Sequence, residues 1–399
     1  MAKIRHGYNR PHADPVLPQV DALVADLRPS DPLLCLRPVT IVAAATRFVA
    51  AFPGDVLYAV KCNPEPRVLR ALWAGGIRHF DCASLAEVKL VRALLPAAEV
   101  HFMHPVKARP AIAEAFDRWQ VRDFALDSPD ELAKILQETV PVGLVGEPPT
   151  LGLFVRLALP KGGAVYDLSG KFGAAPDNAA RLLRAARPYA ARLGITFHVG
   201  SQCLDPAAYT RALALAGEVI AVAGVPVEIV DVGGGFPVRY PDMTPPPLAA
   251  FIDAIELGAA ALPSGIRLWA EPGRALVADG GSVVAQVQLR RDNALYVNDG
   301  VYGNLSDAGA LGFCFPVRRV RLGDSGEPAG LADFILFGPT CDSADRMKGP
   351  FRLPTDMREG DWIEFGQLGA YGACLSSRFN GFGAAGLIEV ADPPMLPPP

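Results

Sequence analysis

Polar side chains follow the short apolar runs in the first 280 residues of the chain. The run "VLYAV" (56–60) leads directly into Lys61. The polar residues and turns that follow the later runs are Asp81, His104, Asp127, Arg156, His198, "GGGFP" (233–237) and Glu271. A lysine amine can attack a carbonyl, and a glycine-rich turn can bind an anion through its backbone N–H groups. If these residues lie together, they could act on a phosphorylated carbonyl compound.

Pyridoxal phosphate is a cofactor that uses all of these groups at once. Lys61 can form a Schiff base with its aldehyde, and the glycines of "GGGFP" can hold its phosphate. Glu271 can keep the pyridine nitrogen protonated, which makes the ring an electron sink. His198 can stack on the face of the ring. We therefore predict a pyridoxal phosphate site.

Each of these residues also has a simpler explanation when it is considered alone. A lysine after a strand is usually a solvated loop residue, and three glycines in a row often mark a tight turn. Glu271 could be a carboxylate in the first turn of a helix, and Cys341 could be a small core residue. The prediction therefore depends on their joint occurrence in the order of the strands.

Eight apolar runs alternate with helical segments, and this alternation predicts the fold. The candidate strands are 56–60, 77–80, 99–103, 122–126, 151–157, 195–199, 227–232 and 266–270. Their continuous apolar character is typical of a parallel sheet buried on both faces. The segments between them, such as 84–95 and 177–193, have helical spacing. We predict an α/β fold with a (β/α)8 TIM-type barrel over 35–280, in which the strand ends converge on one mouth. A doubly wound open sheet is the alternative.

The pattern of apolar and turn-forming residues changes after Gly280. Short strand-like runs separated by Gly, Pro and Asp predict a mostly antiparallel β domain over 281–392; they are "SVVAQVQLRR", "ALYVNDG", "FPVRRVRL", "DFILFGP", "DWIEFGQ" and "GLIEV". Residues 1–34 are predicted to pack on this β domain. The proline-rich end, 393–399, is predicted to be a disordered tail.

Composition excludes several classes of function. The net charge of −4 leaves no basic surface for nucleic acid, and no apolar run approaches the ~18 residues that span a bilayer. The first residues, "MAKIRHGYNRPHADP", lack the apolar core of a secretion signal. Seven cysteines without a CxxC pair suit a reducing compartment, and no zinc-type cluster of ligands is present. We expect a cytoplasmic enzyme with a small-molecule substrate, and no metal, nucleic-acid or membrane partner.

The chain resembles the alanine-racemase-like, barrel-type (fold type III) pyridoxal-phosphate decarboxylases, and most closely the ornithine decarboxylase group. The matching motifs are collinear and cover nearly the whole chain. They are "YAVKCN" (58–63), "FDCAS" (80–84), "FVRL" (154–157), "KFGA" (171–174), "FHVGSQC" (197–203), "DVGGGFP" (231–237), "EPGR" (271–274), "VNDGVYG" (297–303), "GPTCDSAD" (338–345), "GAYG" (369–372) and "FNGF" (379–382).

The resemblance implies a role for each matching residue of the barrel. Lys61 would be the Schiff-base lysine, His198 would stack on the ring, and Glu271 would pair with the ring nitrogen. Asp81 and Arg156 would support the cofactor. The phosphate would be held by Ser201, Gly233, Gly234, Gly235, Arg274 and Tyr371.

The resemblance also implies a substrate side of the site. Cys341 would be the acid that reprotonates the substrate carbon, and Asp342 would contact the distal amine of the substrate. Tyr302 and Phe379 would line the pocket. In this family the segment with Cys341 and Asp342 reaches across from the second subunit of a head-to-tail homodimer, so each active site would be shared between two chains.

One position departs from the pattern of the ornithine enzymes. They usually place a second aspartate some eight residues beyond the motif that matches "VYG", where this chain has Leu311. Asp307, which lies earlier in the same loop, could take its place. Alternatively, Asp307 is only a turn former before Ala-Gly.

The expected activity is pyridoxal-phosphate-dependent decarboxylation of a basic L-amino acid. Ornithine, giving putrescine, is the first candidate, and lysine, giving cadaverine, is the second; either reaction would be an entry step to polyamines. Alternatives within the family are diaminopimelate and carboxynorspermidine decarboxylases. A catalytically inactive regulatory homologue is the alternative from another class. Such a homologue should lack the lysine, the cysteine or the phosphate shell, and this chain has all three.

Overall fold

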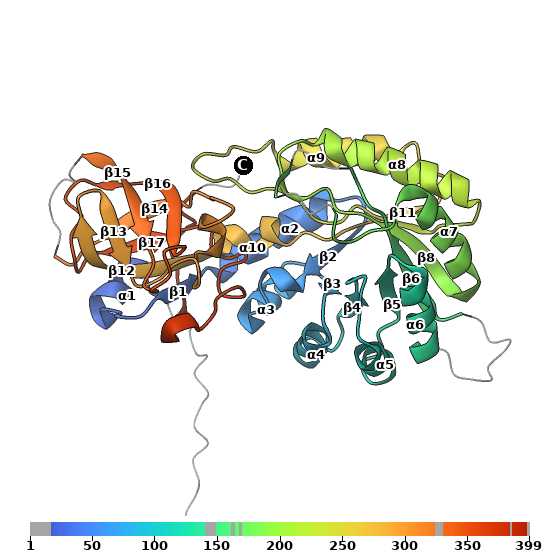
Figure 1. Ribbon diagram of the computed structural model, residues 1–399, viewed down its shortest axis with the longest axis horizontal. Coiled ribbons are helices and arrows are strands. Elements are labelled where there is room, and N and C mark those ends of the chain that lie inside the picture. Colours follow the sequence, from blue (N-terminus) through green and yellow to red (C-terminus); the bar gives the residue numbers. More distant parts are fainter. Residues whose placement is uncertain are drawn as a thin grey trace, which may run out of the picture.

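The computed structural model describes residues 17–139, 149–160, 164–166, 170–323, 330–383 and 385–396. The barrel and the β domain lie side by side along the longest axis of the molecule, with α2 (Pro38–Ala51) and α10 (Arg274–Val277) between them (Figure 1). Within the described ranges, no helix is long and apolar enough to cross a membrane.

Eight parallel strands close the barrel in the spatial order β10-β11-β2-β3-β4-β5-β6-β8. Their bounds are β2 (Asp55–Ala59), β3 (His79–Cys82), β4 (Glu99–Phe102), β5 (Asp123–Leu126), β6 (Leu151–Arg156), β8 (Ala190–Thr196), β10 (Ile229–Asp231) and β11 (Arg267–Ala270). Each predicted strand overlaps one of them. The barrel prediction is confirmed, and closure excludes the open sheet.

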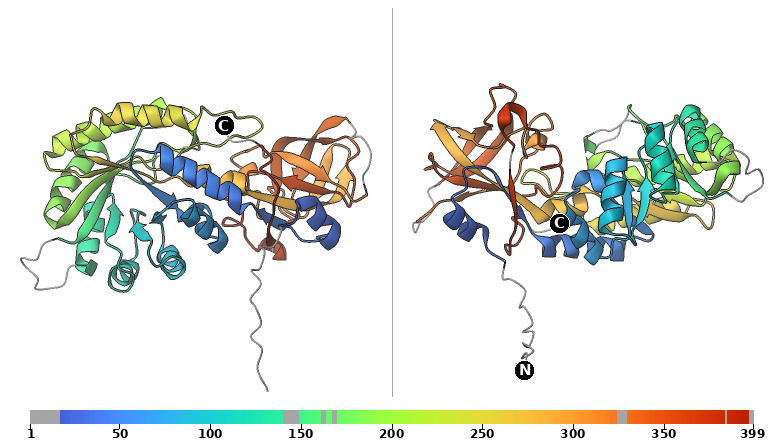
Figure 2. Two further views of the ribbon diagram at one scale, coloured as in Figure 1. Left: turned by 180° about the vertical axis from the view of Figure 1, so that it is seen from behind. Right: turned by 90° about the horizontal axis from the view of Figure 1, so that it is seen from below.

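Helices cover the outside of the barrel, as both views in Figure 2 show. Besides α2, they are α3 (Pro66–Ala74), α4 (Leu85–Leu94), α5 (Arg109–Asp117), α6 (Pro129–Thr139), α7 (Pro176–Ala186), α8 (Ala207–Ala223) and α9 (Leu248–Ala259). Local sequence sets their starts. For example, Ser84 Oγ accepts from the Glu87 backbone at 3.3 Å, and Glu87 Oε2 accepts from the Ala83 N–H at 2.7 Å, which closely resembles a capping box.

The helix predicted over 177–193 was too long. Helix α7 ends at Ala186, and β8 begins at Ala190. Pro188 cannot continue a helical hydrogen-bond ladder, and Leu193 and Ile195 are fully buried in the barrel wall. Pairing of β8 with β6 and β10 therefore overrides the helical pattern.

The β domain is a mixed, mostly antiparallel sheet of eight strands. They are β1 (Leu33–Leu36), β12 (Gly281–Arg291), β13 (Ala294–Val297), β14 (Val317–Val320), β15 (Leu331–Phe337), β16 (Arg346–Pro354), β17 (Trp362–Phe365) and β18 (Gly386–Glu389). Strand β16 was not predicted, because Gly349 and Pro350 interrupt its pattern. The barrel was predicted to begin at residue 35, but residues 35 and 36 belong to β1, which pairs with β12 and β18.

The N-terminal segment packs on the β domain. Helix α1 (Val20–Leu27) buries Val20, Leu23 and Val24 in a small core with Val284 and Trp362. The first sixteen residues of the predicted segment 1–34 lie outside the described residues.

The predicted tail is partly ordered. The Pro393 carbonyl accepts a hydrogen bond from Arg37 Nε at 3.2 Å, and Met395 is only partly exposed. The disorder predicted for 393–399 is therefore wrong for residues 393–396, because Arg37 binds the backbone at this point. Residues 397–399 lie outside the described residues.

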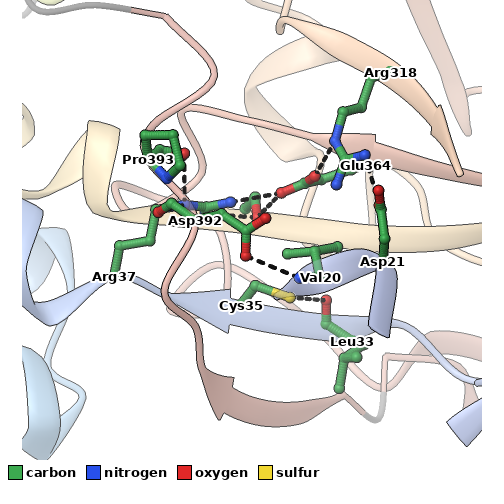
Figure 3. Close-up of polar contacts among 10 residues, drawn as sticks. Val20, Asp21, Leu33, Cys35, Arg37, Arg318, Glu364, Asp392 and Pro393 are labelled. Carbon is green, nitrogen blue, oxygen red and sulfur yellow. Dashed lines mark hydrogen bonds and ion pairs between the residues drawn. The ribbon is translucent and has the colours of Figure 1, made fainter. Parts of the chain in front are cut away.

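A buried ionic network joins the N-terminal segment to the β domain (Figure 3). Arg37, 3% exposed, donates from Nη2 to Glu364 Oε1 at 2.7 Å. Ser282 Oγ donates to the same oxygen at 2.6 Å, and Arg318 bridges the other oxygen of Glu364 to Asp21. Burial raises the pKa of Glu364. Arg318, Ser282 and Arg37 together lower this pKa by more than burial raises it, so the net pKa lies below the ordinary value.

Replacing Glu364 with glutamine should destabilise the fold by about 3–5 kcal/mol, because it leaves the Arg37 charge buried without its partner. Urea unfolding monitored by circular dichroism measures the change. Asp21→Asn is the matched control at the exposed end of the same network, where a charge pair is worth about 0–1 kcal/mol. Equal losses in the two variants would contradict this prediction.

Candidate active site

Lys61 lies at the barrel mouth, where the carboxyl ends of the strands meet. Strand β2 ends at Ala59, and a short 3-10 turn, Val60–Cys62, carries the lysine. Lys61 Nζ lies 3.1 Å from Asp81 Oδ2, which belongs to the neighbouring strand β3. The lysine side chain is 44% exposed, whereas Asp81 is 2% exposed. A buried carboxylate therefore holds an amine that remains accessible.

Charges around Lys61 favour its ammonium form in this structure. Withdrawal from water lowers the pKa of Lys61, but the carboxylates of Asp81 and Glu271 raise it by more, so the net shift is upward. Formation of a covalent bond requires the neutral amine. A ligand that enters the site must therefore change this charge balance or take up a proton from Lys61.

Glu271 lies directly after β11 and is 4% exposed. Its backbone N–H donates to the Gly233 carbonyl at 2.8 Å, which ties it to the glycine turn. Burial, and then Asp231 and Asp81, raise the pKa of Glu271 well above the ordinary value. Oε1 is buried and has no hydrogen-bond partner among the described residues. Glu271 thus presents an unused acceptor that a positively charged ring nitrogen would satisfy.

His198 is neutral at the mouth. Burial, and then the positive charges of Arg156 and Lys61, lower its pKa well below the ordinary value. Its Nδ1 lies 3.0 Å from the Gly200 N–H and accepts its hydrogen bond. This bond assigns the hydrogen of the ring to Nε2. A neutral, flat imidazole is suited to stack on an aromatic ligand.

The glycine turn requires glycine for close approach and for conformation. Gly233 and Gly235 have φ of 69° and 105°, which side chains rarely adopt. A Cβ on Gly233 would lie 2.1 Å from the Phe197 carbonyl oxygen, and one on Gly234 would lie 2.6 Å from that of Glu271. The Gly233 N–H donates to Asp231 Oδ1 at 2.8 Å. Among the described residues, no hydrogen bond uses the N–H of Gly234 or Gly235, so these two groups can bind an anion.

Ser201 begins β9 (Ser201–Cys203), which pairs with β7 (Ala164–Tyr166). The Cys203 N–H donates to the Gly235 carbonyl at 2.9 Å. This bond places β9 beside the glycine turn. Ser201 is thus a second group on the same side of the mouth.

Arg274 is the buried cation among the residues that the sequence predicts to bind the phosphate. It is 6% exposed, and its Nη1 donates to Tyr240 Oη at 2.7 Å. Its guanidinium carbon lies 4.8 Å from the Phe313 ring centre and 4.9 Å from that of Tyr371. The Nε is buried without a partner among the described residues.

Asp307 contacts Arg274, and its side chain is not exposed to solvent. Its carboxylate is 7% exposed, and Oδ2 lies 3.0 Å from Arg274 Nη2. Neither interpretation of Asp307 from the sequence, as a substrate acid or as a turn former, included this ion pair. Leu311, at the position of the missing acid, is partly buried against the main core.

Arg156 ends β6 and is partly exposed. It pairs in register with Thr196 of β8, which in turn pairs with Asp231 of β10. These are the last residues of three neighbouring strands, so the arginine belongs to a row along the barrel wall at its mouth. Its charge lowers the pKa of Glu271 less than the neighbouring acids raise it.

A second group of predicted site residues lies in the β domain. Cys341 is exposed; its backbone N–H and its Sγ both lie near Asn380 Oδ1, at 3.1 and 3.2 Å. The Tyr302 hydroxyl donates a short hydrogen bond to Asp342 Oδ2, and the rings of Tyr302 and Phe379 are 4.9 Å apart. The pKa of Asp342 is lowered most by the hydrogen bond from the Ala344 N–H and next by the hydrogen bond from Tyr302.

This second group opens onto a cleft of about 670 Å³. Its lining includes Asp31, Tyr296, Thr340, Cys341, Asp342 and Phe382. Among the described residues, no barrel residue lines this cleft. Within one chain the predicted site residues therefore fall into two groups, one around Lys61 and one around Cys341.

The residues of the barrel fit pyridoxal phosphate. The buried orphan atom Glu271 Oε1 suits a protonated ring nitrogen, and the orphan Arg274 Nε suits an acidic oxygen. The turn of Gly233 to Gly235 is a cradle that any Cβ would fill. When bound, this cofactor supplies an electron sink for the bond that breaks next to the substrate amine.

Three residues of these two groups were not predicted from the sequence. Tyr240, which holds Arg274, lies in a loop without a distinguishing pattern. Asn380, which contacts Cys341, carried a signal in the Asn-Gly pair of "FNGF". Asp231 was part of the quoted motif "DVGGGFP" but received no role.

Comparisons with known proteins agree with this geometry. Residues 39–278 match the family "Pyridoxal-dependent decarboxylase, pyridoxal binding domain". The lysine/ornithine decarboxylase of Selenomonas ruminantium is 32% identical over 350 residues, which are 86% of this chain and 84% of that protein.

Two solved structures are similar over almost their whole length. The arginine decarboxylase of Paramecium bursaria Chlorella virus, bound to agmatine, has a TM-score of 0.81 at 27% identity, covering 93% of this chain and 99% of that chain. The lysine/ornithine decarboxylase of Vibrio vulnificus, complexed with putrescine, has a TM-score of 0.79 at 30% identity, covering 93% and 97%. The chain therefore belongs to the family of pyridoxal-dependent decarboxylases, and it is an amino-acid decarboxylase that uses pyridoxal 5'-phosphate.

Proposed function

We propose that this enzyme decarboxylates a basic L-amino acid, with ornithine as the first substrate and lysine as the second. The observation that carries the proposal is the pair of Cys341 and Asp342. A proton donor lies next to a partly exposed carboxylate whose pKa is lowered, so the carboxylate is ionised near neutral pH. Such a carboxylate attracts a distal ammonium group and repels a distal carboxylate.

The residues of the barrel would carry out the first part of the reaction. Lys61 would hold the cofactor covalently, and Asp81 would orient its amine. Glu271 would hold the ring nitrogen in its protonated form, and the neutral His198 would cover one face of the ring. The glycine turn, Ser201, Arg274 and Tyr371 would hold the phosphate.

The residues of the β domain would complete the reaction. The thiol of Cys341 would donate a proton to the substrate carbon from which carbon dioxide has left. Asp342 binds the distal ammonium group and so fixes the distance between this group and the reacting carbon. Tyr302 holds Asp342 through its hydroxyl, and Phe379 provides an apolar wall for the methylene chain.

Relatives support the substrate class and differ in the substrate. The names of the Selenomonas and Vibrio proteins include both lysine and ornithine, and the viral enzyme is an arginine decarboxylase. Diamine products such as putrescine or cadaverine follow from the proposal, and polyamine synthesis would be their use.

A panel of ornithine, lysine, arginine and meso-diaminopimelate tests the proposal. The purified holoenzyme is assayed for carbon dioxide and for the amine product. We expect the highest kcat/KM with ornithine, then lysine, and no turnover of meso-diaminopimelate. Preferred turnover of meso-diaminopimelate would overturn the assignment to basic amino acids.

Replacing Asp342 with alanine should raise the KM for ornithine about 10- to 100-fold, because a hydrogen bond to a charged group is lost. Steady-state kinetics of amine formation measures the change. Asp333→Ala, at an exposed aspartate of β15 that is 3.7 Å from Arg352, is the control and should leave KM unchanged. An unchanged KM in Asp342→Ala would remove this residue from the substrate site.

We also propose that the enzyme is a homodimer in which each active site uses two chains. The cleft at Cys341 contains no described barrel residue, and Lys61 belongs to the barrel. A two-fold axis would bring the Cys341 half site of one chain to the Lys61 half site of its partner. The half sites would then be complete only in the dimer.

Mixing two inactive variants should restore activity if the sites are shared. Lys61→Ala and Cys341→Ala chains that exchange equally form hybrids in half of the dimers, and one site of each hybrid carries neither change. About a quarter of wild-type amine formation should return. Subunit exchange is verified by mass spectrometry of a tagged chain. No recovery despite complete exchange would mean that one chain builds the whole site.

The cysteines support a reducing, cytoplasmic location. All seven are described and unpaired. Disulfides are rare in such a compartment.

A further inference from the structure

Asp231 is a buried carboxyl group to which the reaction scheme above gives no role. It ends β10 directly before the glycine turn, and it is 0% exposed. Its Oδ1 accepts a hydrogen bond from the Gly233 N–H at 2.8 Å. Its second oxygen, Oδ2, is buried without a hydrogen-bond donor among the described residues. A carboxylate left in this way would be costly, because burial penalises its charge.

Glu271 is the second buried acid beside the glycine turn. Its backbone N–H binds the Gly233 carbonyl, and Asp231 Oδ1 binds the Gly233 N–H, each at 2.8 Å. The charge of each acid acts on the other, and both Glu271 Oε1 and Asp231 Oδ2 are buried without a donor among the described residues. Two neighbouring carboxylates in a buried site are not both ionised, because their charges repel. One proton held by the pair would remove this repulsion and supply the missing hydrogen bond.

The surrounding charges agree with one shared proton. The groups that act on the pair are the cations Lys61 and Arg156 and the anion Asp81. With one proton on the pair, two negative charges balance two positive charges in this cluster. Burial, as the largest cause, raises the pKa of Asp231, and the same cause together with Asp231 raises that of Glu271.

We propose that Asp231 is a positioning residue for both ends of the cofactor, which holds Glu271 through the shared proton and the phosphate turn through the Gly233 N–H. The inference rests on the proposed role of Glu271 at the ring nitrogen. Without a cofactor the proton resides on Glu271. When a protonated ring nitrogen lies against Glu271, the carboxylate form of Glu271 is favoured, and the proton moves to Asp231. No proton is gained or lost by the pair.

In this arrangement the Asp231 side chain sets the distance between the phosphate-binding turn and the Glu271 carboxylate. Gly233 follows Asp231 by two residues, and the Gly233 carbonyl in turn accepts the backbone N–H of Glu271 at 2.8 Å. A displacement of Asp231 would therefore shift the phosphate turn and the ring carboxylate together. The proposed shared proton also keeps that carboxylate directed toward the ring.

Binding of two probes to the cofactor-free chain tests the proposal. The probes are pyridoxal phosphate and its 1-deaza analogue, in which carbon replaces the ring nitrogen. Dissociation constants are measured by quenching of tryptophan fluorescence. The ratio of the two constants reports the contact between Glu271 and the ring nitrogen, whereas damage to the phosphate turn weakens both probes equally.

In the wild type, pyridoxal phosphate should bind about 10- to 100-fold more tightly than the analogue, as expected for a hydrogen bond between charged groups. The preference should be lost in Glu271→Ala and in Asp231→Ala, and the latter should also bind both probes more weakly. Asp231→Asn should keep the preference, because the amide oxygen still accepts from Gly233 and the amide N–H still donates to Glu271.

The outcomes separate this inference from the proposed role of Glu271. A wild-type preference in Glu271→Ala would overturn the contact of Glu271 with the ring nitrogen. Loss of preference in Glu271→Ala but not in Asp231→Ala would overturn only the role of Asp231. Loss in Asp231→Asn would overturn the shared proton. If Asp231→Ala does not fold, Asp231→Ser replaces it, because its hydroxyl can reach Gly233 but is too short to reach Glu271 as well.

Discussion

Replacing Lys61 with alanine should abolish amine formation and remove the near-ultraviolet and visible absorbance of the covalently bound cofactor. In the proposed function this amine is the nucleophile that binds the cofactor, and Asp81 Oδ2 lies 3.1 Å from it at the barrel mouth. Among the described residues, no other lysine lies within two positions of the end of a barrel strand. Absorbance of the purified protein and single-turnover release of carbon dioxide measure the two effects.

Lys89→Ala is the matched control for this variant. Its side chain is 43% exposed, close to the 44% of Lys61, and it also pairs with a carboxylate, Glu114, at 2.8 Å. It lies on α4, on the outside of the barrel. We expect wild-type absorbance and turnover in this control. Wild-type turnover in Lys61→Ala would disprove the assignment of Lys61.

Replacing Glu271 with alanine should lower kcat by about 10²- to 10³-fold, the usual loss when one preorganised electrostatic group is removed. In the proposed function the carboxylate stabilises positive charge on the ring nitrogen, which the electron sink requires. Rates are measured at saturating cofactor, so that weaker binding does not contribute. A kcat within a few-fold of the wild type would show that the ring functions without Glu271.

The sequence by itself determined the barrel, and it predicted which residues of the candidate site lie together. Continuous apolar runs such as "VLYAV" and "IRLWA" encode strands buried on both faces, because each residue of such a run is removed from water. Their order predicts which residues meet, since all parallel strands of a barrel end at the same mouth. Lys61, His198, the glycine turn and Glu271 could therefore be named together, and the glycines carry a conformational requirement of their own.

Only the tertiary structure decided features that depend on distant partners. The segment 190–193 has helical spacing but lies in β8, since pairing with β6 and β10 is worth more than local helix propensity. Pro393 was predicted to be disordered because the residues around it are rich in proline. In the structure, a hydrogen bond from Arg37, more than 350 residues earlier, holds its backbone.

The same reason explains the acids that the sequence did not assign. An aspartate has the same local signal whether it caps a turn, contacts a substrate or pairs inside the protein. The ion pair of Asp307 with Arg274 and the electrostatic interaction of Asp231 with Glu271 each join residues from different strands or loops. Burial then turns these contacts into shifted pKa values, because a charge removed from water depends on the groups that surround it. Residue types and spacing thus identified the chemistry, and three-dimensional packing assigned each acid its partner.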